Sequence, residues 1–173
     1  MKNTNHSLFD KYEMIKDLGT GSSGSVTLVR HISMDQERAL KKVPKASAFA
    51  ESALSEARLL KSLEHPSIPR IFDFEEDNAF YYIVEEYIDG ETLDSFLLHQ
   101  QLISPGLFFN ICEQLCNVFI YLHTQISTPI IYRDLKPEHI IVCHNKLKLI
   151  DFGVSAYVIQ AGNNFNHYGN IEF

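Results

Sequence analysis

The sequence contains no tryptophan, few cysteines and no long apolar run. A membrane-spanning helix needs about 20 consecutive apolar residues, and the absence of such a run predicts that this segment does not associate with a membrane. Residues 1–8 lack the apolar stretch of a signal peptide. The three cysteines are an odd number, which argues against a disulfide framework. Together these absences predict a protein of the reducing cytoplasm.

Positive charge is also scarce, with 15 Lys and Arg against 22 Asp and Glu and a net charge of −7. This acidic balance argues against a nucleic acid or an anionic membrane surface as a partner. The length of 173 residues, 45% of them hydrophobic, suits one globular unit with a substantial core. Cys112 and Cys116 lie four residues apart in an apolar helical pattern. This spacing predicts buried free thiols rather than a metal pair or a disulfide.

Apolar periodicity and turn residues predict a β-rich first half of the chain. A strand, a glycine turn and a second strand are expected over residues 12–29, followed by a third short strand over 38–43. A helix is predicted over 51–63, and Pro66 prevents its continuation. A hairpin follows over 71–87, because two apolar, aromatic-rich segments flank a short polar turn.

The second half is predicted to be mainly helical. A short helix is expected over 92–99 and a long one over 104–122, with Ser104 as its N-cap residue. Two short strands follow over 140–143 and 146–150. The long helix also carries phenylalanines outside its main apolar stripe. The overall pattern is that of an α+β fold, with a β-rich lobe followed by a helical lobe.

Four short motifs occur in a fixed order along the chain: Gly19-Thr20-Gly21-Ser22-Ser23-Gly24-Ser25-Val26, Ala39-Leu40-Lys41, Tyr132-Arg133-Asp134-Leu135-Lys136-Pro137-Glu138-His139 and Asp151-Phe152-Gly153. Each motif alone is weak evidence of function, but the ordered set resembles that of the eukaryotic-like Ser/Thr protein kinases, including those of bacteria. The resemblance runs from Tyr12 to Phe173 and implies a protein-kinase-like bilobal fold. It implies an N-terminal extension over residues 1–11 and a partial kinase domain over 12–173. Within this domain, an N-lobe is expected over about 12–87, a hinge over about 85–91 and an incomplete C-lobe over 92–173.

Gly19, Gly21 and Gly24 have the spacing of a loop whose backbone amides can approach phosphate oxygens. A strand rather than a helix is expected after them, which argues against a dinucleotide-binding fingerprint. The alternative is an ordinary hairpin turn. The resemblance implies ATP as the nucleotide and a divalent metal ion, Mg²⁺ with Mn²⁺ as an alternative.

The resemblance also assigns the residues around the adenine ring. Val26 and Ala39 would lie above the ring and Ile141 below it, while the backbone groups of Glu86 and Ile88 would bond its edge. These assignments come from the resemblance alone.

Lys41 would hold the α- and β-phosphates and pair with a glutamate of the following helix. Glu56 is the expected partner, and Glu51 is the alternative if the helix is rotated. The same register places Glu85 at the back of the nucleotide site. A buried carboxylate needs a cation, and Lys41 is the expected one. A register shift of one residue would instead leave Glu85 exposed.

By the same resemblance, Asp134 is the catalytic base, Lys136 neutralises the γ-phosphate and Asp151 binds the metal ion. His139 stands where the family has a metal-binding asparagine. Magnesium prefers oxygen ligands, whereas imidazole nitrogen suits other divalent metals better. The site could therefore use one well-held metal, hold a second through Asp151 and water, or bind nucleotide without transferring phosphate. A packed apolar column would support it: Leu60, Ile71, Tyr132 and Phe152.

The regulatory segment departs from the family in its hydroxyl residues. Arg133 is expected to receive a phosphate, but Ser155, Tyr157 and Tyr168 are the only hydroxyls between Asp151 and Phe173. Asn170 replaces the usual threonine of the substrate-docking loop.

The resemblance implies further helices beyond Phe173, which would cover the apolar face of the long helix. We therefore expect self-association or a partner on that face, and a loosely held tail from about Gly162.

The first hypothesis is a Ser/Thr kinase that transfers the γ-phosphoryl group of ATP to protein hydroxyls. The alternatives are a pseudokinase-like nucleotide-binding module and a kinase remnant that acts through a partner. The protein substrate is not specified by the sequence.

Overall fold

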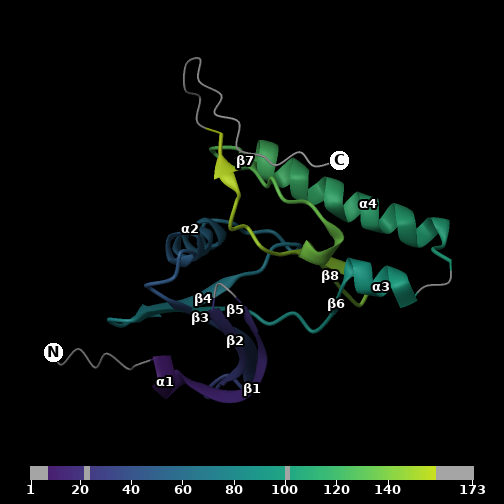
Figure 1. Ribbon diagram of the computed structural model, residues 1–173. Helices are drawn as coiled ribbons and strands as arrows, with labels where there is room; N and C mark the ends of the chain where they lie inside the picture. The colour runs from purple at the N-terminus through teal and green to yellow at the C-terminus, as the bar shows by residue number, and fades with distance from the viewer. Residues whose placement is uncertain (1–7, 22–23, 100–101, 159–173) are drawn as a thin grey trace.

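The computed structural model describes residues 8–21, 24–99 and 102–158. Its first half is an antiparallel sheet with the strand order β1-β2-β3-β5-β4 (Figure 1). The strands are β1 (Tyr12–Gly21), β2 (Gly24–His31), β3 (Gln36–Pro44), β4 (Ile71–Glu76) and β5 (Phe80–Glu86). Each neighbouring pair except β3 and β5 is joined by a short turn, so most of the pairing is local. The predicted β-rich lobe is confirmed.

One helix, α2 (Ala50–Lys61), packs against this sheet. Its Ala53 and Ala57 contact Val43 of β3 and Ile83 of β5 in one buried cluster. Small side chains on the contact face let the helix lie close to the strands. Glu56 shares a helix face with Ser52, four residues earlier, and both side chains bond to the second half of the chain, at Phe152 and Gly153.

A short helix, α1 (Leu8–Lys11), precedes the sheet. Leu8 is only 1% exposed and packs with Tyr12, Val29 and Tyr82. The Lys11 ammonium lies 2.7 Å from the Asp73 carboxylate of β4. The last residues of the predicted N-terminal extension are therefore part of the first lobe's core.

The second half contains two helices and several short elements. They are β6 (Glu91–Thr92), α3 (Leu93–His99), α4 (Pro105–Ile120), the π-helical turn η1 (Tyr121–Gln125), β7 (Ile130–Ile131), the 3₁₀ turn η2 (Pro137–His139), β8 (Ile140–Cys143), β9 (Lys146–Leu149) and β10 (Ala156–Tyr157). Strands β6, β8 and β9 form one small sheet, and β7 pairs with β10. Ser104 caps α4 as predicted, since the Leu107 amide donates to its hydroxyl at 3.2 Å. Across the described ranges, no helix is both long and apolar enough to span a bilayer.

The main core lies between α4 and the strands of the second half. Ile111, Val118 and Leu122 are buried there with Tyr132 and Phe152. The opposite face of α4 is uncovered in the described chain, where Phe109 is 68% and Ile120 50% exposed; Phe108, beside the buried stripe near the start of the helix, is 53% exposed.

The burial predicted for the helical cysteines is wrong for Cys116, which is exposed, while Cys112 is partly buried. The buried stripe of α4 passes through Ile111, Leu115 and Val118. A thiol one position further along is rotated by about 100° from that stripe. Both thiols are free, as predicted.

Candidate active site

A hollow of about 340 Å³ lies between the sheet and the second half of the chain. All five residues predicted to surround an adenine ring line this hollow: Val26, Ala39, Glu86, Ile88 and Ile141. Lys41, Glu56 and Asp151 line it as well. These residues come from β2, β3, α2, the end of β5 and the linker after it, β8, and the segment after β9. The fold therefore brings together residues that are far apart in the sequence.

The glycine loop forms the tip of the β1–β2 hairpin, where Gly21 pairs with Gly24. Gly24 has a φ of +140°, and an added Cβ would lie 2.1 Å from the Lys42 carbonyl oxygen, so this position needs glycine for the fold itself. An added Cβ at Gly19 or Gly21 would meet no described atom within 4 Å. Packing therefore does not explain those two glycines, whereas the close approach of a ligand to the backbone would.

Glu56 joins the two halves of the chain. Its Oε2 lies 2.9 Å from the Lys41 ammonium, and its Oε1 accepts a hydrogen bond from the Phe152 amide at 2.9 Å. The expected partner of Lys41 is thus Glu56 and not Glu51. Burial acts to lower the pKa of Lys41, but the Glu56 carboxylate, with smaller contributions from Glu85 and Asp151, acts in the opposite direction, so the pKa is raised and Lys41 remains protonated.

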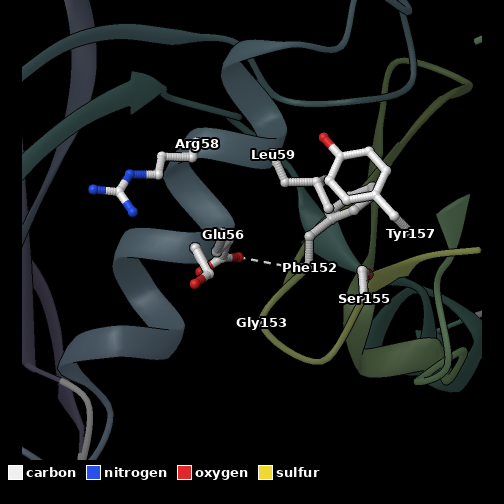
Figure 2. A pocket seen from close by; sticks show the side chains of 8 residues that line it. Glu56, Arg58, Leu59, Phe152, Gly153, Ser155 and Tyr157 are labelled. Atoms are coloured by element: carbon white, nitrogen blue, oxygen red, sulfur yellow. Dashed lines mark hydrogen bonds between the residues drawn. The ribbon is translucent and has the colours of Figure 1, made fainter. Parts of the chain in front are cut away.

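Figure 2 shows this junction from the side of a second hollow, of about 320 Å³, beside the Asp-Phe-Gly segment. Phe152 and Leu59 both line this hollow, with their side chains close together, and the Arg58 guanidinium points away from them. Ser52 of α2 donates a hydrogen bond to the Gly153 carbonyl at 2.8 Å. The sequence analysis missed this second tie between α2 and the Asp-Phe-Gly segment, and a lone serine in a helix gives no signal for it.

Glu85 lines the back of the first hollow, as the register predicted. Lys41 is the nearby cation, as expected, and its field acts on Glu85. Its direct ion pair is with Glu56, however, and no ion pair to Glu85 is present among the described residues. Burial raises the pKa of Glu85 to about 7; the field of Lys41 acts against this rise and that of Glu56 adds to it. The carboxyl group therefore changes charge near neutral pH.

The residues expected to carry the chemistry converge around His139, whose side chain is largely buried. Its Nδ1 lies 3.1 Å from the Asp134 backbone oxygen and 3.2 Å from Asp134 Oδ2. Its Nε2 lies 3.3 Å from Asp151 Oδ2. The Lys136 ammonium also lies 3.2 Å from Asp134 Oδ2. His139 thus contacts both aspartates, a geometry that the motif spacing alone did not indicate.

Two residues of this site have left-handed backbone conformations, with φ of +74° for Arg133 and +60° for Asp151. Non-glycine residues adopt this region at some energetic expense, and such strain is concentrated at functional sites.

The packed column beneath the site is present. The rings of Tyr132 and Phe152 meet edge to face with centroids 5.0 Å apart. Leu60 is buried in the same cluster, and Ile71 packs against it. The Tyr132 hydroxyl donates a hydrogen bond to the Ile150 carbonyl, and burial raises its pKa. This column supports the segment that carries Asp151.

Part of the predicted regulatory segment is described. The Ser155 hydroxyl donates to the Tyr132 carbonyl at 3.1 Å, and the Tyr157 hydroxyl lies 3.4 Å from that of Ser62. Tyr168, Asn170 and the tail from Gly162 lie outside the described residues.

Comparison with known proteins agrees with this geometry. The protein kinase domain family matches residues 12–172, and the chain therefore belongs to the protein kinase family. It is 31% identical over 150 residues to the serine/threonine-protein kinase PrkC of Bacillus subtilis, covering 84% of this chain and 23% of that protein. It is 35% identical over 172 residues to calcium-dependent protein kinase 4 of Plasmodium falciparum, covering 91% of this chain and 31% of that protein. The serine/threonine-protein kinase pkn2 of Myxococcus xanthus is 31% identical over 156 residues, with coverages of 86% and 18%. The chain thus spans less than a third of the length of these relatives.

Proposed function

We propose that this chain binds ATP with a divalent metal ion and transfers the γ-phosphoryl group to serine or threonine hydroxyls of protein substrates. The observation that carries the proposal is the pair of bonds made by Glu56, to Lys41 and to the Phe152 amide. In protein kinases the lysine–glutamate pair and the aspartate of the Asp-Phe-Gly segment must both be in place for transfer.

Each residue of the site has a separate proposed role. Lys41 binds the α- and β-phosphates, with Glu56 holding its ammonium in place. Asp134 accepts the proton of the substrate hydroxyl, and Lys136 neutralises charge on the γ-phosphate. The glycines allow backbone amides to approach the phosphates, while Val26, Ala39 and Ile141 contact the adenine ring and the backbone of Glu86 and Ile88 bonds its edge.

Asp151 is the residue best suited to hold Mg²⁺, because its carboxylate is half exposed and supplies hard oxygen ligands. Within the described ranges, no group of three or more His, Cys, Asp or Glu side chains gathers to hold a metal. A bound ion would therefore take further ligands from the nucleotide phosphates and water. Such an ion neutralises phosphate charge in the transition state.

His139 gives a reason for manganese to be accepted beside magnesium. The Asp134 carbonyl can only accept a hydrogen bond, so Nδ1 must donate it. In the neutral ring Nε2 then carries a lone pair, 3.3 Å from an oxygen of Asp151. A nitrogen and an oxygen side by side suit Mn²⁺ better than Mg²⁺. We propose that nucleotide binds more tightly with Mn²⁺ than with Mg²⁺.

Nucleotide binding is tested by thermal unfolding with and without MgATP. A hundredfold excess over Kd stabilises a protein by about 2.7 kcal/mol, which for a chain of this size raises Tm by about 5–10 °C. Lys41→Ala and Asp151→Asn should each reduce this rise. Lys42→Ala is the matched control, because the Lys42 ammonium lies over the Phe80 ring, 4.0 Å from its centroid. The absence of stabilisation at millimolar nucleotide would remove the basis of the proposal.

Transfer is tested separately with γ-labelled ATP and a library of serine and threonine peptides. Asp134→Asn should abolish labelling while the nucleotide-dependent rise in Tm persists. Stabilisation by nucleotide without labelling in the unmodified chain would instead indicate a nucleotide-binding module.

Metal preference is tested by calorimetry with a non-hydrolysable ATP analogue. His139→Asn should shift the preference toward Mg²⁺. His144→Asn is the control, since His144 lies in a turn with a φ of +48°, a conformation that asparagine tolerates. An unchanged Mn²⁺-to-Mg²⁺ affinity ratio in His139→Asn would show that the imidazole takes no part in binding the metal.

A further inference from the structure

A third hollow, of about 670 Å³, lies on the other side of the linker that follows β5. Glu86, Tyr87 and Ile88 line both this hollow and the candidate nucleotide site, while every other lining residue differs between the two. Successive residues of a strand point to opposite faces. In agreement with this, Ala39 of β3 lines the nucleotide site and its neighbour Arg38 lines the other hollow.

This hollow, which we call the basic groove, is lined by four Lys and Arg side chains and two carboxylates. One carboxylate, Glu86, is neutralised by Lys148, whose ammonium lies 2.6 Å from it. Asp89 is the other. The three remaining cations, Arg38, Arg70 and Lys146, make no ion pair with a carboxylate of the described chain. This local excess of positive charge stands out because the whole chain has a net charge of −7.

Two of the donors in the basic groove are held in place without an acidic partner. The Arg38 guanidinium lies 3.8 Å from the centroid of the Phe72 ring. Its two terminal nitrogens each donate one hydrogen bond, to the Glu37 carbonyl and to the Gln36 side chain, and each carries a second N–H for a ligand. His65 accepts the Ser67 amide at Nδ1, so its neutral ring carries the hydrogen on Nε2. Burial and the nearby Lys148 lower the pKa of His65, so it donates as a neutral group near pH 7.

We propose that the basic groove binds an acidic, carboxylate-rich peptide segment of a partner protein. The cations come from three separate elements, β3, the loop before β4 and the start of β9, an arrangement that suits an extended ligand more than a single phosphate. Pro66, Phe72 and Ile88 give it apolar walls for side chains of the peptide. This binding does not depend on phosphoryl transfer.

The test measures fluorescence anisotropy of a labelled peptide of alternating Glu and Leu, with a Gln-for-Glu peptide as the ligand control. The groove variant is Arg70→Glu with Lys146→Glu. Its matched control is Lys16→Glu with Lys61→Glu, which makes the same change of net charge at exposed lysines that do not line the groove. We expect the groove variant to bind about tenfold or more weakly, since two charge-assisted contacts are lost. The control variant should stay within about threefold, because distant exposed charges are screened.

The remaining measurements separate this proposal from its alternatives. Lys146→Arg should retain binding, and added salt should weaken it. The nucleotide-dependent rise in Tm should be the same in the groove variant, which keeps a failure here distinct from a failure of the proposed kinase function. The proposal is overturned if the Glu peptide does not bind, if the Gln peptide binds equally, or if the control variant loses as much affinity. Tighter binding of a phosphopeptide or an RNA oligonucleotide would overturn it as well.

Discussion

Replacing Glu85 by Gln is expected to stabilise the protein near pH 8 and to have much less effect near pH 5. Burial raises the pKa of the Glu85 carboxyl to about 7 in the folded protein, against an ordinary value of 4.5. The unfolded chain therefore loses this proton first as the pH rises. Stability falls between about pH 4.5 and about pH 7, because the folded state resists the ionisation that the unfolded state undergoes.

The size of the effect follows from the two pKa values. A difference of 2.5 units, 7 minus 4.5, corresponds to about 3 kcal/mol at 1.36 kcal/mol per unit. Glutamine has a similar shape and does not ionise, so the variant escapes this loss. We expect a gain of up to about 3 kcal/mol near pH 8 and of less than about 1 kcal/mol near pH 5.

Urea unfolding at the two pH values measures this difference directly. Glu51→Gln is the control, since Glu51 is an exposed carboxylate of α2, and it should show no comparable change with pH. An equal gain for Glu85→Gln at both pH values, or no gain near pH 8, would show that the carboxyl is not desolvated in the way described.

Two further outcomes are expected. Gly24→Ala should lower the free energy of unfolding by about 1–3 kcal/mol, because its φ is +140° and the new Cβ would meet the Lys42 carbonyl. Gly21→Ala should leave stability nearly unchanged but weaken nucleotide binding. Thermal unfolding with and without nucleotide distinguishes the two variants. Phe109→Glu should reduce self-association through the exposed face of α4, where Phe109 is 68% exposed. Sedimentation velocity measures this, and a protein that is monomeric at every concentration before substitution would contradict it.

The sequence predicted those parts of the molecule that depend on local pattern and fixed spacing. The hairpins of the sheet and the Ser104 cap follow from turn residues and capping chemistry. The pairing of Lys41 with Glu56 was implied by the family resemblance and is confirmed. The family assignment rests on the same motifs and agrees with the match over residues 12–172.

The features that were missed depend on contacts between distant segments or on helix rotation. Cys116 shares the helical spacing of the core but lies beside the buried stripe of α4. Glu85 was placed correctly, yet its expected cation was already bound by Glu56. His139 contacts two aspartates that lie on different segments of the chain, Asp134 and Asp151. Periodicity and composition carry no information about such contacts.

The two carboxylate oxygens of Glu56 tie the position of α2 to both halves of the chain at the same time. Oε2 is bound to the sheet through Lys41, and Oε1 is bound to the second half of the chain through the Phe152 amide. Both bonds are 2.9 Å long, and a hydrogen bond is lost beyond about 3.5 Å. A shift of α2 by about 1 Å away from both partners would therefore break both bonds together. We therefore expect activity to be lost abruptly rather than gradually as this helix is displaced. Any event that moves α2 would remove a contact from each half of the site at the same time.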